Sequence, residues 1–231
     1  MRAPAVTFPL SLCLLVGCGA ADPTASWVAG TGPLAAVTGR AALFGPRNGL
    51  TLDGATVSVA EAPQHRATVA ADGSFSLQVP SGRPLSFLVE QPGFHPNQSA
   101  TLAIDAQGIA MLGFQVPTED TVGSLAVLAA LEPDPTRCQV ATTVSRKGTA
   151  PYGGPGLGEP AYFAYASDSF IYPDPALGAT SIDGGVIIAN LPVGEYTLTA
   201  TKPGKQFSPV AIRCRAGVLV NAAPPHGLEE L

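Results

Sequence analysis

Short runs of alternating apolar and polar residues recur along most of this chain, and Gly, Pro, Asn and Asp separate them. In residues 74–79, Phe75, Leu77 and Val79 would face one way, and the polar residues between them the other. Alternation with a period of two predicts a β-strand that buries one face. In the first half, the pattern predicts seven strands, at residues 35–44, 55–61, 66–70, 74–79, 85–91, 100–104 and 109–116. With no amphipathic helix of convincing length, we expect an all-β chain of antiparallel β-sandwiches.

A set of turn residues occurs twice along the chain. Asp72-Gly73 matches Asp183-Gly184, Pro80 and Gly82 match Pro192 and Gly194, and Pro92-Gly93 matches Pro203-Gly204. Gly, Pro and Asp at such spacings form tight turns between strands. We therefore expect two copies of one β-domain, at residues 34–117 and 121–225, with the boundary within residues 117–123.

The first twenty residues, MRAPAVTFPLSLCLLVGCGA, combine one positive charge at Arg2, a mostly apolar run and then small residues. This order is typical of a secretory signal. The apolar run, residues 6–16, is about half of the roughly 20 residues needed to cross a bilayer, so we expect no membrane-spanning helix here.

The end of this run, Leu15-Val16-Gly17-Cys18, resembles the lipobox of bacterial lipoproteins. The resemblance implies that the signal peptide, residues 1–17, is removed, that Cys18 is acylated, for example with palmitate, and that residues 18–33 tether the protein to a membrane of the bacterial cell envelope. Gly19, rather than Asp, after the cysteine favours the outer membrane. The alternative is an ordinary secretory signal in which Cys18 is incidental.

The chain has four cysteines, of which Cys13 lies in the signal and Cys18 would carry lipid. The remaining two, Cys138 and Cys214, are expected to pair as a disulfide, because the envelope is oxidising. A metal-binding pair is the alternative, but two isolated cysteines without clustered histidines make a poor metal site. We also expect no nucleic-acid partner, since the net charge is −5 and no cluster of Lys and Arg is present.

Beyond the lipobox, the segments VTGRA, GATVSV, DGSFSLQVPSG and QPGF of the first half resemble the carboxypeptidase regulatory-like domains, within the transthyretin-like and Cna B-type group of β-sandwiches. In the second half, DGGVIIANLPVGEYTLTATKPG carries the resemblance, and the front of that half departs from the pattern. The resemblance implies a rigid, non-catalytic module with a structural, adhesive or ligand-binding role.

Some Cna B-type domains join a lysine to an asparagine through an isopeptide bond, with a buried glutamate as the proton shuttle. Residues 30–146 contain no lysine, and Ala200 stands where the resemblance would place that glutamate. We expect no isopeptide bond in either half, and expect the Cys138–Cys214 bridge to staple the fold instead.

Six of the fifteen aromatic residues fall within residues 152–172. Tyr162 and Phe163 must point to opposite faces of a strand, so we expect them not to share one core. Exposed tyrosines beside a glycine-rich loop would form a stacking surface for a sugar or a contact site for an envelope protein. The residues of this candidate site are Tyr152, Tyr162, Tyr165 and Tyr172. The alternative is that Phe163, Tyr165 and Phe170 fill the second sandwich, with tyrosines at its rim.

Candidate chemistry is otherwise sparse. His65, His95 and His226 each lie in proline-containing turn or tail sequence without a second ligand nearby, so we expect exposed loop residues and no metal or cofactor. No G-x-S-x-G elbow and no phosphate-binding loop occurs in the sequence. We therefore expect a lipid-anchored, non-catalytic envelope protein. A carbohydrate-binding accessory protein is the main alternative, and an enzyme is a more distant one.

Overall fold

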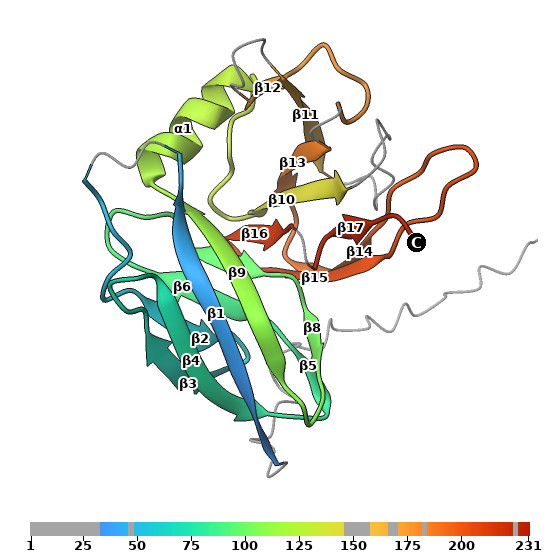
Figure 1. Ribbon diagram of the computed structural model, residues 1–231. Helices are drawn as coiled ribbons and strands as arrows, with labels where there is room; N and C mark the ends of the chain where they lie inside the picture. The colour runs from blue at the N-terminus through green and yellow to red at the C-terminus, as the bar shows by residue number, and fades with distance from the viewer. Residues whose placement is uncertain (1–32, 46–48, 146–157, 166–170, 182–183, 224–225) are drawn as a thin grey trace, which may run out of the picture.

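The computed structural model describes residues 33–45, 49–145, 158–165, 171–181, 184–223 and 226–231 (Figure 1). The strands of the first half are β1 (Leu34–Phe44), β2 (Thr56–Val59), β3 (Ala62–Thr68), β4 (Ser74–Pro80), β5 (Arg83–Leu85), β6 (Phe87–Glu90), β7 (Asn97–Ser99), β8 (Leu102–Ile104) and β9 (Ile109–Pro117). After helix α1 (Glu119–Leu128), the strands are β10 (Cys138–Ser145), β11 (Glu159–Tyr165), β12 (Ile171–Asp174), β13 (Gly185–Leu191), β14 (Gly194–Leu198), β15 (Val210–Cys214), β16 (Leu219–Ala222) and β17 (Leu228–Glu229). The chain is mostly β, as expected, but helix α1 departs from the expectation of an all-β chain. No helix in these ranges is long and apolar enough to cross a membrane.

The first half is a β-sandwich with its own core. Strands β4, β1 and β9 form one sheet, and β3, β2, β6 and β7 lie in the other. Phe75, Leu77 and Val79 of β4 are buried while Ser76 and Gln78 are exposed, as the alternating sequence predicted. Their core cluster also holds Phe114 of β9, whose ring centroid lies 5.9 Å from that of Phe75.

One glycine of β1 is required by close packing inside this sandwich. A Cβ at Gly39 would lie 2.0 Å from the carbonyl oxygen of Leu112 and 2.5 Å from Cζ of Phe75. Both distances are below any normal contact, so only glycine lets β9 and the Phe75 ring approach β1 here. The glycine of the segment VTGRA thus marks a packing position in the core.

The second half repeats the central sheet of the first. Strand β10 pairs antiparallel with β13 and parallel with β16, as β1 pairs with β4 and β9. The matching turns correspond in detail, because the Ala41 N–H donates to Gly73 O at 2.8 Å and the Val144 N–H donates to Gly184 O at 2.8 Å. Both glycines have positive φ angles, 85° and 77°. The second turn residue of each Asp-Gly pair therefore plays the same role in both halves.

Three features differ from the sequence-based expectations. The sheets are mixed rather than purely antiparallel, because β9 pairs in parallel with β1, and β16 pairs in parallel with β10. The hairpin between β2 and β3 turns earlier than predicted, at Ala60 and Glu61. The predicted domain boundary, residues 117–123, overlaps the start of helix α1. Thr118 caps this helix by accepting a hydrogen bond from the Thr121 N–H.

The two halves are joined by a continuous sheet. Strand β7 of the first half pairs in parallel with β16 of the second, with Gln98 opposite Val220. The resulting strand order is β12-β11-β13-β10-β16-β7-β6-β2-β3, and β17 pairs with β10. A sheet that crosses from one half to the other orients them through backbone hydrogen bonds, in addition to the chain connection between β9 and β10.

Candidate functional site

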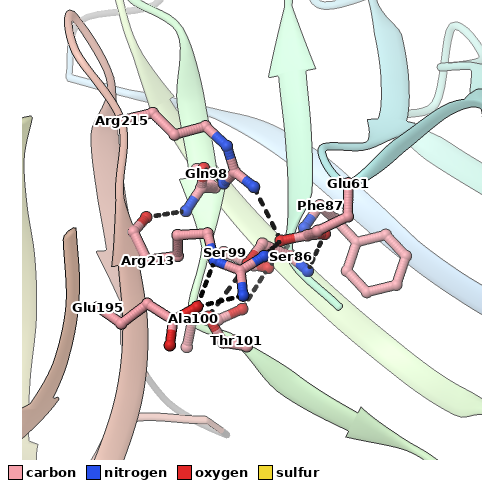
Figure 2. A network of polar contacts seen from close by, with 10 residues as sticks. All are labelled: Glu61, Ser86, Phe87, Gln98, Ser99, Ala100, Thr101, Glu195, Arg213 and Arg215. Carbon is pink, nitrogen blue, oxygen red and sulfur yellow. Dashed lines mark hydrogen bonds and ion pairs between the residues drawn. The ribbon is translucent and has the colours of Figure 1, made fainter. Parts of the chain in front are cut away.

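A buried carboxylate lies where the two halves meet (Figure 2). Glu61, in the turn between β2 and β3, has a side chain that is only 1% exposed. Its Oε1 accepts hydrogen bonds from Nη1 of Arg213 at 2.9 Å and from Nη2 of Arg215 at 2.8 Å, and its Oε2 accepts one from the Ser86 N–H at 2.8 Å. A buried charge is stabilised only by partners of this kind, so Glu61 of the first half depends on two arginines of the second.

Strand β7 adds a second polar residue to the same junction. Gln98 is fully buried, and its Nε2 donates to the backbone oxygen of Arg213 at 2.7 Å. Arg215 Nη1 in turn donates to Gln98 Oε1. One amide side chain is thus satisfied at both ends, which fixes the position of β7 against β15 as well as against β16.

The charges of this junction balance. Glu195 of β14 binds Arg213 from the other side, and its side chain is 62% exposed. Two carboxylates and two guanidinium groups therefore form one neutral network of Glu195, Arg213, Glu61 and Arg215, which we call the junction network. Such an arrangement holds surfaces together, since each group is already occupied by a partner.

The junction network was not predicted from the sequence. The signal available was the segment Ile212-Arg213-Cys214-Arg215. Because Cys214 belongs to the second core and neighbouring side chains of a strand alternate, both arginines must face away from that core. What covers their side of the strand could not be inferred from the sequence.

Cys138 and Cys214 form a disulfide, as expected. Their Cα atoms are 5.4 Å apart, and the bridge links β10 of the large sheet to β15 of the small β14-β15 sheet. Both cysteines belong to the second core cluster and are at most 1% exposed. The bridge therefore joins the two layers of the second half across their common core.

The candidate aromatic site is only partly described. Tyr162 is 7% exposed and packs in the second core cluster, so its ring is not available as an open stacking surface. Phe163, its neighbour on the opposite face of β11, is also 7% exposed. Tyr172 is half-buried. Tyr152 and the side chain of Tyr165 lie outside the described part of the structure.

The burial of both Tyr162 and Phe163 has a structural cause. The large sheet turns one face toward the second core, with Val140 of β10 and Ile188 of β13, and the opposite face toward helix α1. Phe163 lies on this second face. Tyr162 and Phe163 do not share one core, as expected, since only Tyr162 belongs to the second core cluster, but both rings are covered because both faces of the sheet are covered here.

A cavity of about 430 Å³ lies between helix α1 and the face of the large sheet opposite the second core. Val122, Leu125 and Ala126 form its helical wall, and the sheet wall includes Ile187 and Leu219. The ends of β1 and β9 close one side through Leu43, Phe44 and Pro117. The cavity therefore lies where both halves and the helix meet.

The three histidines lie in different surroundings, and none is a plain exposed loop residue. His65 lies in β3, where its Nδ1 is 2.9 Å from Gln78 O. His95 is 16% exposed and pairs with Glu119 at 2.9 Å. His226 is half-buried, and burial lowers the pKa of its imidazole, partly offset by the nearby Glu229 carboxylate. Across the described ranges, no group of three or more His, Cys, Asp or Glu residues is placed to hold a metal ion.

Cys18 lies outside the described residues, so the lipidation site stays a prediction from the sequence. No protein-family model matches the chain. No curated protein matches it in sequence.

Solved structures show distant likenesses. The TIE protein of Bacillus anthracis aligns with 12% identity and a TM-score of 0.29, over 86% of this chain and 34% of that one. A streptococcal ancillary pilin aligns with 13% identity and a TM-score of 0.25, over 72% of this chain and 50% of that one. GBS52, the minor pilin of Streptococcus agalactiae, aligns with 12% identity and a TM-score of 0.22, over 86% of this chain and 96% of that one. This chain thus spans about a third of the TIE protein and half of the ancillary pilin. Values this low assign no function to it.

Proposed function

We propose that this protein is a non-catalytic module of the bacterial cell envelope, anchored by lipid at Cys18, whose two β-sandwich halves act as one rigid body. The observation that carries the proposal is the junction between the halves, where the β7–β16 pairing and the junction network meet. A spacer or adhesive module needs a fixed shape, and this junction supplies one. Its partner would be an envelope protein or a polysaccharide.

Rigidity is supported by the chemistry of the junction. Removing one partner of a buried ion pair leaves an uncompensated charge and costs about 3–5 kcal/mol. Any motion that separates the halves would leave the charge of Glu61 without its arginine partners. It would also break the backbone hydrogen bonds between β7 and β16. Separation of the halves is therefore opposed by two independent sets of contacts.

The non-catalytic role is supported by the state of the polar groups. The carboxylate of Glu61 accepts three hydrogen bonds, and the guanidinium groups of Arg213 and Arg215 are bound to it. Charged side chains that are paired with one another in this way have a structural role. The anchor is supported by the apolar run and by the segment Leu15-Val16-Gly17-Cys18, which are typical of envelope lipoproteins, and Gly19 favours the outer membrane.

Two measurements test the proposal. Cell fractionation should find the full chain in the membrane fraction and the Cys18→Ser variant in the soluble fraction; a variant that stays in the membrane would contradict the anchor. Hydrogen exchange followed by mass spectrometry should show that the slowest amides of β1 and β10 open together. If the core of one half opens while the other stays protected, the two halves are not one rigid body.

A further inference from the structure

We infer that the cavity between helix α1 and the large sheet is a binding site for a small, neutral, largely apolar molecule. Its volume of about 430 Å³ falls within the range of roughly 300–1,000 Å³ typical of small-molecule sites. This function is separate from the rigidity and anchoring proposed above. It requires only that the helix and the sheet keep the geometry described here.

The position and burial of helix α1 support this inference. Val122, Leu125 and Ala126 recur at helical spacing and turn one apolar stripe toward the sheet. An amphipathic helix normally buries such a stripe in the core, yet none of the ten residues of α1 is buried. The helix contacts the edge of the large sheet at β12, and its apolar stripe is only half-buried where it faces the cavity.

The sheet presents a complementary wall. On β13 and β16, Ile188 and Val220 point into the second core, so Ile187 and Leu219 point the other way, toward α1. Thr143 of β10 and Asn221 of β16 lie on the same wall and are half-buried. The wall thus combines apolar area with a few neutral polar groups, which is typical of sites that bind and orient a small ligand.

The lining determines the charge of the ligand. Among the described residues that line the cavity there is no Asp, Glu, Lys, Arg or His. A carboxylate, sulfonate or ammonium group placed there would lose its hydration without gaining an opposite charge, which is strongly unfavourable. A hydroxyl or amide group could instead bond with Thr143 or Asn221. The cavity therefore favours neutral ligands over ionised ones of the same shape.

A matched pair of fluorescent probes tests this selection. N-phenyl-1-naphthylamine is neutral, and 8-anilino-1-naphthalenesulfonate carries the same ring system with one negative charge. With the full chain carrying Cys18→Ser, purified without detergent, we expect saturable binding of one neutral probe per chain and at least about tenfold weaker binding of the anionic one. Absence of saturable binding, or equal affinity for both probes, would overturn the inference.

Neighbouring helix positions provide a matched control for location. Ala126→Phe places a ring in the cavity, whereas Val127→Phe places the same ring on a position that is 79% exposed. We expect Ala126→Phe to weaken binding of the neutral probe at least about tenfold and Val127→Phe to leave it unchanged.

Leu219→Trp should fill the cavity from the opposite wall, and it serves as a second blocking variant that leaves the helix sequence unchanged. Thermal melting identifies any variant that fails to fold. If the folded blocking variants bind as well as the parent, or if Val127→Phe weakens binding to the same extent, the probe binds elsewhere and the inference is wrong. Membrane fractionation is unaffected by either result, so the anchor is tested separately.

Discussion

Glu61 and Arg213 are 152 residues apart in the sequence, yet Nη1 of Arg213 donates a hydrogen bond to Oε1 of Glu61 at 2.9 Å. The same carboxylate oxygen also binds Arg215. The side chain of Glu61 is nearly inaccessible to solvent, so its charge is compensated by the second half of the chain and by the Ser86 N–H. These contacts join the two sandwiches through particular side chains, whereas the shared sheet joins them through backbone groups that every residue carries.

Removal of the charge of Glu61 should therefore weaken the whole protein. We expect Glu61→Gln to lower the free energy of unfolding by about 3 kcal/mol, because Arg213 and Arg215 lose their common counter-charge in a buried setting. Glu195→Gln is the matched control, since Glu195 binds the same Arg213 from an exposed position, and it should cost only about 0–1 kcal/mol. Urea denaturation measures both. Equal losses for the two variants would contradict a special role for the buried carboxylate.

The disulfide should resist reduction until the second half opens. Because Cys138 and Cys214 are at most 1% exposed, we expect dithiothreitol to leave the bridge intact in buffer and to reduce it in urea. Replacing both cysteines with alanine should lower the free energy of unfolding by roughly 4 kcal/mol, the loop-closure value for a separation of 76 residues. Thiol labelling follows the reduction and urea denaturation the stability. Rapid reduction under native conditions would show that the second core opens easily.

Substitution of Gly39 should be strongly destabilising. In Gly39→Ala, the new Cβ would collide with the Leu112 carbonyl and the Phe75 ring, and we expect a loss of about 1–3 kcal/mol or more. Gly113→Ala is the control, because Gly113 lies in the neighbouring strand β9 and a Cβ added there would meet no other atom within 4 Å. Thermal melting compares the two variants. A small effect at Gly39 would mean that β1 and β9 can move apart.

The half-buried His226 should make stability depend on pH. Burial lowers the pKa of its imidazole below the ordinary value of 6.5, so the unfolded chain binds a proton more readily than the folded one. Its contribution to stability is present above pH 6.5 and is lost as the pH falls through the lowered folded-state pKa. We expect His226→Gln to lose less stability than the parent between about pH 7.5 and pH 5. Urea midpoints across this range measure the difference, and parallel curves would exclude the effect.

Much of the strand content followed from local patterns. The alternation in residues 74–79 correctly indicated which side chains of β4 are buried, and the repeated Asp-Gly pairs marked two equivalent turns. Local patterns did not predict strand pairing between segments that lie far apart in the sequence. The parallel pairing of β1 with β9 leaves no mark in either strand, because the hydrogen bonds join backbone groups that every residue carries.

The candidate sites show the same division. The pairing of Cys138 with Cys214 was predictable from the cysteine count and the expected envelope location, since few partners were available. The burial of Phe163 together with Tyr162 was not, because it depends on helix α1 covering the second face of the sheet. The sequence of helix α1 is only weakly amphipathic, so its helical period did not stand out among the alternating strand patterns. Thr118 and the acidic residues Glu119 and Asp120 are nevertheless typical of a helix start.

By itself, the sequence determined that the chain forms short strands, that their turns recur in two halves, and that two cysteines remain to staple the second half. These features follow from side-chain alternation and from the backbone freedom of Gly and the fixed φ of Pro, which act within a few residues. Only the tertiary structure decided that β7 pairs with β16, that Glu61 is neutralised by Arg213 and Arg215, and that α1 stands over a cavity. Those outcomes depend on which surfaces meet after the strands have formed, and contacts between residues so far apart are set by the packing of the whole chain.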